Sequence, residues 1–380
     1  MYNLINLTQY LADLEYLVNI DSGSNDCPDG LNKCADFFEE RFRVLGWQIH
    51  RYDLGDHTGN CLVCANREAA HYDVLLIGHL DTVFPVGTAA ARPFRYDAEK
   101  QLAYGPGVCD MKHGSLLMYY LMKELAPEVN EKLNILCIFN PDEEIGSRHS
   151  GEVLEKYAAM TDYIYVYEAG SGDGARCVER KGSTGFTVNF KGKAGHCGYV
   201  FSNGAKSAVS EMAKWIVRLD EFQSRERNTT VNVGTASGGI ATNVVAEDAS
   251  LSVSIRYSID ETAAIDAMLE ELKAGASEHG IGIDIPAVKR SQPLIPSEKG
   301  WEYIRHVAEL TAVNGIRFST RARGGLSDAN RMAKFGAICL DGMGPAGGSD
   351  HSDREYMNVN TVQEAYDLSM LLLTDLCDGK

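Results

Sequence analysis

Hydrophobic and polar positions follow two different periods along the first half of the chain. Apolar residues between 31 and 45 recur at helical spacing and predict one amphipathic helix with a single buried face. A further helix is predicted over 114–126, and short apolar runs predict buried strands over 73–78, 133–139 and 163–167. This alternation predicts an open α/β sheet with helices on both faces, and in such sheets ligands bind where the strands end.

The middle of the chain, from about residue 181, has a different order of elements. Its pattern predicts strand, helix, strand, strand, helix and strand, over 185–191, 205–222, 229–235, 250–257, 262–277 and 281–285. This is the order of the ferredoxin-like split unit, β-α-β-β-α-β. We therefore expect a second domain of the α+β class here.

The last part of the chain returns to the first pattern. The proline-bearing segment 288–296 is expected to connect back to the first domain. Two helices and a strand are predicted after it, over 301–313, 361–377 and 337–341. We therefore predict that residues 1–180 and 290–380 form one domain, into which residues 181–289 are inserted.

Length, composition and charge narrow the classes of protein to consider. A chain of 380 residues is longer than one hydrophobic core usually supports, which favours two domains. The formal net charge of −17 argues against a nucleic-acid partner, because phosphates require a basic surface. No apolar run reaches the roughly 18 residues of a membrane span, and no signal peptide is visible at the N-terminus. We expect a cytoplasmic protein with no membrane partner.

The ten cysteines could indicate disulfides or a zinc site. Cys61 and Cys64 form a CxxC pair, but the pair lies in a strand-like run and no second pair completes a metal site. A cytosolic chain of this length would keep its thiols reduced. We interpret these residues as thiols of the hydrophobic core.

Five short groups of potential metal ligands lie far apart in the chain, at or near the ends of strand-like stretches. They are His79 with Asp81, then Asp110, Glu143 with Glu144, Glu168, and His351. One imidazole at each end of the series and carboxylates between them are the ligands of a two-metal hydrolytic site. Two divalent ions are therefore predicted; zinc suits these ligands, and cobalt or manganese would also fit.

The residue types suggest a division of roles within these groups. Asp110 is the candidate bridging ligand, because its glycine- and proline-rich approach would bring the backbone close to the ions. Asp81 is expected to accept the second imidazole N–H of His79 and so orient its ring. The adjacent acids Glu143 and Glu144 point in different directions, so one can bind metal while the other acts as general base and then protonates the leaving amine.

These motifs resemble the di-zinc exopeptidases and amidohydrolases of the glutamate carboxypeptidase, desuccinylase and aminoacylase group, with glutamate carboxypeptidase the most similar. The segments that carry the resemblance contain His-Leu-Asp-Thr from His79, Gly-Val-Cys-Asp-Met-Lys from Gly107, Asp-Glu-Glu-Ile-Gly-Ser from Asp142, Glu168, and Gly-Pro-Ala-Gly-Gly-Ser-Asp-His ending at His351. The resemblance extends from the first helix to the last. It implies a zinc-exopeptidase-like catalytic domain with an inserted ferredoxin-like domain for dimerisation or for use as a lid.

The resemblance also implies a role for each residue. The ligands of the two zinc ions would be His79, Asp110 and Glu168 for one, and Asp110, Glu144 and His351 for the other. Glu143 would be the acid/base and Asp81 would orient a ligand. In the inserted domain His196 is similar to a histidine that stabilises the tetrahedral oxyanion, in dimeric relatives within the partner subunit's site.

Asn243 and Arg256 lie in segments similar to those that bind the substrate carboxylate. The planar guanidinium of Arg256 suits that task because it pairs bidentately with a carboxylate. An arginine on a strand is equally often an exposed ion-pair partner, so both interpretations stay open. His113, where a glycine is usual, and Cys197, directly after His196, depart from the family pattern.

The expected reaction is hydrolysis of an amide or peptide bond next to a free carboxylate, in a small peptide or N-acyl amino acid, by a homodimer. N-acyl amino acid deacylation or desuccinylation, and dipeptidase or tripeptidase activity, are alternatives with the same di-zinc mechanism. A catalytically silent scaffold of the same fold is a further alternative. Loss of Glu143 or of a ligand would favour the scaffold, and none of them is lost.

Overall fold

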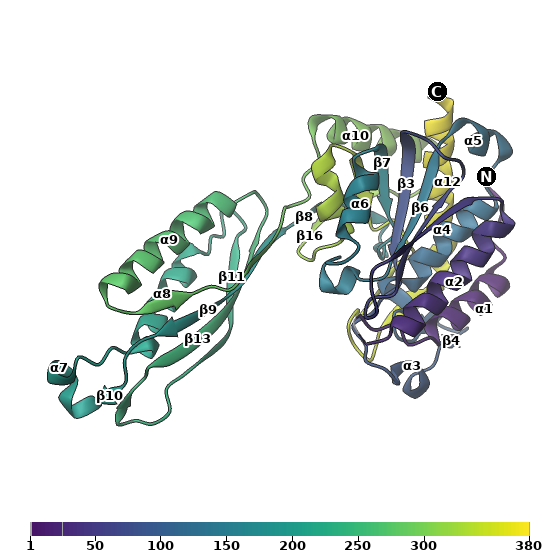
Figure 1. The fold of residues 1–380 in the computed structure, drawn as a ribbon. Helices are drawn as coiled ribbons and strands as arrows, with labels where there is room; N and C mark the ends of the chain where they lie inside the picture. The colour runs from purple at the N-terminus through teal and green to yellow at the C-terminus, as the bar shows by residue number, and fades with distance from the viewer. Residues whose placement is uncertain (1, 25, 380) are drawn as a thin grey trace. The chain divides into compact units, whose positions relative to one another are not determined.

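A computed structural model describes residues 2–24 and 26–379 and divides the chain into two compact units (Figure 1). The first unit contains the chain up to Glu179, Pro296–Ala322, and the chain from Ser327 onward. The second contains Arg180–Ile295 and Arg323–Leu326. Each unit has its own hydrophobic core.

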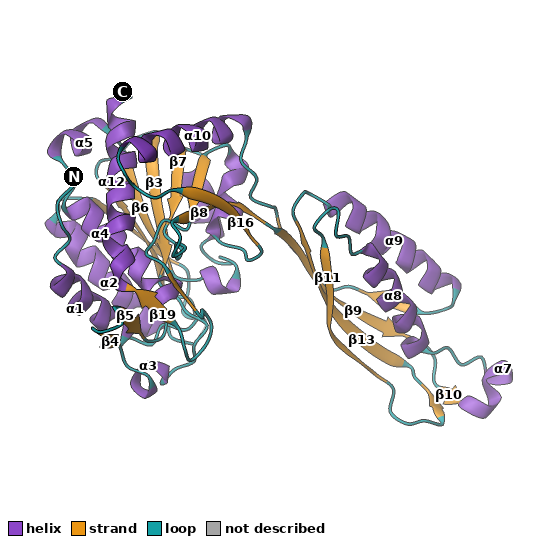
Figure 2. Cartoon of the chain, turned by 180° about the vertical axis from the view of Figure 1, so that it is seen from behind, coloured by secondary structure: helices purple, strands orange, loops and turns teal. Residues whose placement is uncertain are grey.

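A mixed eight-stranded sheet forms the centre of the first unit (Figure 2). Its strands are β1 (Gln48–Asp53), β2 (Asn60–Ala65), β3 (Tyr72–His79), β6 (Ile135–Asn140), β7 (Thr161–Val166), β8 (Ala175–Arg180), β16 (Ser319–Arg323) and β17 (Ile338–Asp341). Their order is β1-β2-β6-β3-β7-β17-β8-β16, in which β6, β3, β7 and β17 run parallel. β3 and β6 are buried along their whole length, as their continuous apolar runs predict for a sheet covered on both faces.

Helices cover both faces of this sheet. The large core contains side chains of α1 (Leu7–Val18), α2 (Pro28–Val44), α4 (His113–Lys123), α10 (Glu298–Val313) and α12 (Val362–Asp378). Val74 and Leu76 of β3 belong to this core, whereas Leu75 and Ile77, which alternate with them, point to the other face. There α6 (Gly151–Ala158) and α11 (Asp328–Met332) contact β7. No helix of the described part of the chain is long and apolar enough to cross a membrane.

The helix predicted between 31 and 45 is confirmed as α2. Its buried residues include Leu31, Cys34, Ala35, Phe38 and Phe42. The ring of Phe38 stacks on Phe139 of β6, with 4.1 Å between the ring centroids. This contact fixes the helix against the sheet next to the strand that leads to the Glu143-Glu144 pair.

A second, small sheet in the first unit was not predicted. Its strands are β4 (Arg95–Asp97), β5 (Leu102–Tyr104), β18 (Gly347–Gly348) and β19 (Tyr356–Asn358), in the order β18-β19-β5-β4. Tyr104 of β5 lies opposite Tyr356 of β19. Segments that are about 250 residues apart in the chain therefore become neighbours.

The second unit confirms the predicted β-α-β-β-α-β order. Its elements are β9 (Gly182–Lys191), α8 (Ala208–Phe222), β11 (Thr230–Gly238), β13 (Asp248–Tyr257), α9 (Thr262–Glu278) and β14 (Gly282–Asp284). The sheet order β11-β13-β9-β14, with antiparallel neighbours, is that of a ferredoxin-like fold. Side chains of α8 and α9 form its core together with β9 and β13.

The expectation that 288–296 is only a connection is wrong for its first four residues. Val288–Ser291 forms strand β15, which pairs with Phe186, Gly185, Thr184 and Ser183 of β9. β14 pairs with only the last three residues of β9. The first half of that edge therefore offers free backbone groups, and β15 satisfies them.

All ten cysteines are free thiols, and nine of them are buried. Cys61 and Cys64 lie in β2 and are fully buried. The interpretation of this CxxC pair as core thiols is confirmed. Cys197 is the exposed one.

Candidate metal centre and active site

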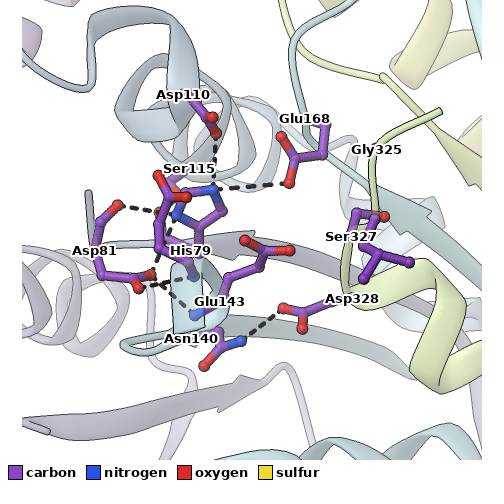
Figure 3. A network of polar contacts seen from close by, with 12 residues as sticks. His79, Asp81, Asp110, Ser115, Asn140, Glu143, Glu168, Gly325, Ser327 and Asp328 are labelled. Atoms are coloured by element: carbon purple, nitrogen blue, oxygen red, sulfur yellow. Dashed lines mark hydrogen bonds and ion pairs between the residues drawn. The ribbon is translucent and has the colours of Figure 1, made fainter. Parts of the chain in front are cut away.

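Three of the predicted ligand groups lie where parallel strands of the large sheet end (Figure 3). His79 is the last residue of β3, and Glu168 follows β7 by two residues. Glu143 and Glu144 begin a short 3-10 helix, Glu143–Ile145, just beyond β6. The carboxyl ends of parallel strands meet at one edge of a sheet, so these remote segments come together there.

Asp110 and His351 come from the small sheet. Asp110 lies in the turn η1 (Val108–Lys112) after β5, where its own backbone is not helical, and His351 lies in the loop between β18 and β19. Nε2 of His79 is 3.0 Å from Oδ1 of Asp110, and Nε2 of His351 is 3.1 Å from its Oδ2. The two oxygens of one carboxylate thus face two different imidazoles, which is the geometry that a bridging ligand requires.

Each imidazole also faces a second carboxylate. Oε1 of Glu168 lies 3.7 Å from Nε2 of His79. Oε2 of Glu144 lies 3.2 Å from Nε2 of His351. These contacts place Glu168 beside His79 and Glu144 beside His351 around Asp110.

The imidazoles compensate the negative charge of the carboxylates. Hydrogen bonds to Asp110 and Glu144 raise the pKa of His351 to about 11. Burial lowers the pKa of His79, but contacts with Asp110 and Asp81 raise it well above its ordinary value. Burial raises the pKa of Asp110, yet the two histidines hold it well below its usual range. Positive charge at the centre is thus a requirement of this cluster, and divalent cations would supply it.

The donor atoms fit divalent metal ions. Ligand atoms of His79, Asp110 and Glu144 lie within 4.8 Å of one another, and so do those of His79, Glu143 and Glu168. Oε1 of Glu144 is buried and has no hydrogen-bond partner among the described residues, so its lone pairs are available to a cation. Imidazole nitrogen and carboxylate oxygen are donors that zinc, cobalt and manganese accept.

Asp81 has more contacts than the sequence predicted. Nδ1 of His79 lies 3.0 Å from its backbone oxygen and 3.3 Å from its Oδ1. The same carboxylate accepts hydrogen bonds from the backbone N–H groups of Glu143 (3.1 Å) and Glu144 (3.0 Å), and from the hydroxyl of Ser24 (2.6 Å). Donation from Nδ1 leaves the Nε2 lone pair of His79 directed at a metal, and the same buried carboxylate holds the Glu143-Glu144 turn.

Glu143 lies beside the ligand cluster, between Glu168 and Asp328 (Figure 3). Desolvation raises the pKa of Glu143 well above its ordinary value, and the charges of Glu168, Asp328 and Glu144 add to the effect. A carboxylate with a raised pKa is a stronger base than a solvent-exposed one.

Asp328 is a site residue that the sequence did not reveal. Its buried carboxylate accepts hydrogen bonds from Nδ2 of Asn140 (2.6 Å) and from the hydroxyl of Ser147. Burial raises the pKa of Asp328 to about 6. Asn140 ends β6 and Ser147 follows the Glu143-Glu144 turn, so Asp328 fixes both ends of that turn. The signal in the sequence is only a helix N-cap at Ser327.

The second unit brings two of its three predicted residues together. His196 of β10 (Gly195–His196) pairs with Val244 of β12 (Val244–Val245), and the N–H of Cys197 donates to the carbonyl of Asn243 at 3.1 Å. His196 and Asn243 are both exposed. They therefore belong to one surface of this unit.

Arg256 lies near one end of β13 in the five-stranded sheet, opposite Ser183 and Thr230. Asp248 lies at the other end of β13, and β10 and β12 form a separate two-stranded sheet. A strand rises about 3.3 Å per residue, which separates these ends of β13 by roughly 25 Å. Figure 2 shows β10 beyond one end of β9 and β13. Burial lowers the pKa of Arg256, and its Nη1 is buried without a partner among the described residues.

Known proteins are similar to this chain along most of its length. A family model described as peptidase family M20/M25/M40 matches residues 75–375. Carboxypeptidase G2 from Pseudomonas sp. (strain RS-16) is 29% identical over 378 residues, which cover 97% of this chain and 90% of that protein. A succinyl-diaminopimelate desuccinylase from Alkalilimnicola ehrlichii is 27% identical over 353 residues, which cover 88% of this chain and 92% of that protein.

Solved structures have the same fold. Aminopeptidase PepT from Bacillus cereus matches with a TM-score of 0.80 at 20% identity, over 98% of this chain and 100% of that chain. An M20 family metallo-carboxypeptidase from Sulfolobus solfataricus matches with a TM-score of 0.75 at 17% identity, over 97% and 99% of the two chains. The predicted α/β fold class and the predicted resemblance are confirmed. The chain belongs to peptidase family M20/M25/M40 and is an enzyme of the metallopeptidase and amidohydrolase class.

Proposed function

We propose that this protein is a di-zinc hydrolase that cleaves an amide or peptide bond next to a free carboxylate. The observation that carries the proposal is the position of Asp110, whose two oxygens face His79 and His351. The similarity to carboxypeptidase G2 over 97% of this chain supports a substrate with a free carboxylate. The five ligands would be His79, Asp110, Glu144, Glu168 and His351.

The side chains of the site supply proton transfer and orientation. When bound, the two ions would polarise the carbonyl group and activate a water molecule. The carboxylate of Glu143 accepts a proton from that water and passes it to the departing nitrogen. The carboxylate of Asp81 orients the ring of His79 and holds the turn that carries Glu143. His196 donates a hydrogen bond to the oxyanion that forms on the carbonyl carbon.

Arg256 is the proposed partner of the substrate carboxylate, because its buried Nη1 is available for a bidentate pair. Replacing Arg256 by alanine should raise KM for an N-acyl glutamate about 10- to 100-fold, the loss expected for one charge-assisted pair, with a smaller change in kcat. Steady-state kinetics measure this, with the α-amide of the same substrate as control. If the variant loses as much activity on the amide as on the acid, Arg256 does not read the carboxylate.

We further propose that the active enzyme is a homodimer in which each site takes His196 and Asn243 from the other subunit. A small peptide cannot contact Arg256 and His196 of the same domain, because Arg256 lies roughly 25 Å along β13 from Asp248, and β10 with His196 lies beyond that end of the sheet (Figure 2). A site that uses all three residues therefore needs two copies of the chain.

Subunit mixing tests this arrangement. Glu143→Ala and His196→Ala should each be inactive, whereas their exchanged mixture should regain about a quarter of wild-type activity, because half of the dimers are mixed and each has one complete site. A mixture of Glu143→Ala with Glu144→Ala is the matched control, since every mixed dimer then has two defective sites. If mixed dimers form, as shown by native mass spectrometry, but activity stays absent, His196 acts in its own subunit.

The identity to a desuccinylase, 27% over 353 residues, favours one second candidate. The same site could remove an N-acyl or N-succinyl group from an amino acid. Steady-state assays against N-acyl glutamates, dipeptides, tripeptides, and N-acetyl and N-succinyl amino acids separate the two. If kcat/KM is highest for an N-acyl glutamate, the first proposal is supported. If it is highest for an N-succinyl amino acid, the first proposal is wrong and the desuccinylase activity takes its place.

A further inference from the structure

Glu355 is a buried carboxylate that the proposed mechanism does not use. The residue is only 1% exposed and directly precedes β19. Its Oε2 accepts a hydrogen bond from the backbone N–H of Gly107 at 3.0 Å. Its Oε1 accepts from Cys109 at 2.8 Å and from Asp110 at 3.0 Å. All three donors belong to the turn that carries the proposed bridging ligand.

The same residue closes the loop that carries His351. This loop joins β18 to β19, and Glu355 is its last residue before β19. Within it Ser349 and His351 have φ values of 60° and 59°, in the left-handed region that residues other than glycine rarely adopt. Such conformations persist only where the surrounding structure holds the backbone in place. Pairing of Tyr356 with Tyr104 and the three hydrogen bonds to Glu355 provide that restraint.

We propose that Glu355 is a positioning residue of the metal centre, which holds the Asp110 turn and the His351 loop in one fixed relation. This inference rests on the proposed function, in which Asp110 and His351 share a metal ion. Without its carboxylate three buried N–H donors would lose their acceptor, and the turn would have to move to satisfy them. The 3.1 Å separation between Oδ2 of Asp110 and Nε2 of His351 would then no longer be maintained.

The test is zinc binding by the full-length protein after chelation, measured by calorimetry. Glu355→Gln keeps the shape of the side chain but presents an amide NH₂ to backbone donors, so zinc should bind about 10- to 100-fold more weakly, as for other residues that support metal ligands. Glu355→Asp keeps the charge on a shorter side chain, so its zinc affinity should lie between that of the wild-type protein and that of Glu355→Gln.

Asp13→Asn is the matched control. Asp13 is also a buried carboxylate, 8% exposed, and accepts hydrogen bonds from Arg41 (3.0 Å) and Tyr120 (2.8 Å), away from the ligand turns. The Asp13→Asn variant should have a lower thermal midpoint of unfolding and an unchanged zinc affinity. If it weakens zinc binding as much as Glu355→Gln does, Glu355 acts through general stability and the proposal is wrong.

Cobalt substitution gives a second readout. The visible absorption of bound Co²⁺ depends on ligand geometry, so its band shape should change in Glu355→Gln and Glu355→Asp but not in Asp13→Asn. Unchanged affinity and an unchanged spectrum in the Glu355 variants would overturn the positioning role alone. Failure of the wild-type protein to bind zinc would instead overturn the proposed function.

Discussion

Replacing Glu143 by alanine is expected to lower kcat about 10³- to 10⁴-fold and to leave the metal content unchanged. The physical reason is that Glu143 is the proton-transfer residue of the proposed mechanism and is not one of its metal ligands. Its backbone N–H would still donate to Asp81, so the turn should keep its place. Steady-state kinetics and elemental analysis of the same preparation measure both quantities.

Glu144→Ala is the matched control for this prediction, because it removes the neighbouring carboxylate from the same turn. Oε2 of Glu144 lies 3.2 Å from Nε2 of His351. Removal of this carboxylate should therefore lower the metal content as well as the activity. A competing arrangement has Glu143 itself as a ligand, since its carboxylate also lies within 4.8 Å of atoms of His79 and Glu168. Loss of metal from Glu143→Ala would favour that arrangement and contradict the acid/base role.

Replacing Asp110 by alanine should remove both ions and reduce hydrolysis to background. Oδ1 of Asp110 faces His79 and its Oδ2 faces His351, so loss of this side chain affects both ligand sets at once. Zinc at 100 times its dissociation constant should stabilise the wild-type fold by about 2.7 kcal/mol, and this stabilisation should vanish in the variant. Thermal unfolding with and without zinc measures the difference.

Glu168→Ala is the matched control for Asp110→Ala, because it removes a proposed ligand that does not bridge the two ions. Oε1 of Glu168 lies 3.7 Å from His79, and in the proposal Glu168 is a ligand of one ion, so its removal should weaken that ion and keep the other. Retention of both ions by Asp110→Ala, or equal losses in the two variants, would show that Asp110 does not bridge.

The ligand groups after β3, β6 and β7 could be predicted because each follows a continuous apolar run. Runs of that kind indicate parallel strands, whose carboxyl ends meet at one edge. The ferredoxin-like order of the second unit was likewise predictable, since its strands and helices have enough residues to show their period.

The small sheet that brings Asp110 close to His351 could not be predicted from the pattern of hydrophobic and polar residues. Its strands have only two or three residues, too few to show alternation. Glu355 and Asp328 were missed for a related reason. Each acts through hydrogen bonds to groups far away in the chain, and no local spacing reports such contacts.

The large distance between Arg256 and His196 could not be predicted from the sequence either. Both residues were assigned to one substrate site by resemblance, which carries no distance between them. Strand register places Arg256 opposite Ser183 at one end of β9 and Asp248 opposite Lys191 at the other, and β10 lies beyond that second end (Figure 2). This geometry is what turns an expected dimer into a specific proposal of shared sites.

A zinc titration of chelated protein, followed by hydrolysis of an N-acyl glutamate, tests the two-metal mechanism. We expect no measurable activity at the start and a rise to a plateau at about two equivalents of zinc per chain, in keeping with a two-metal site. Full activity before any zinc is added, or stoichiometric binding of zinc that leaves activity unchanged, would contradict it.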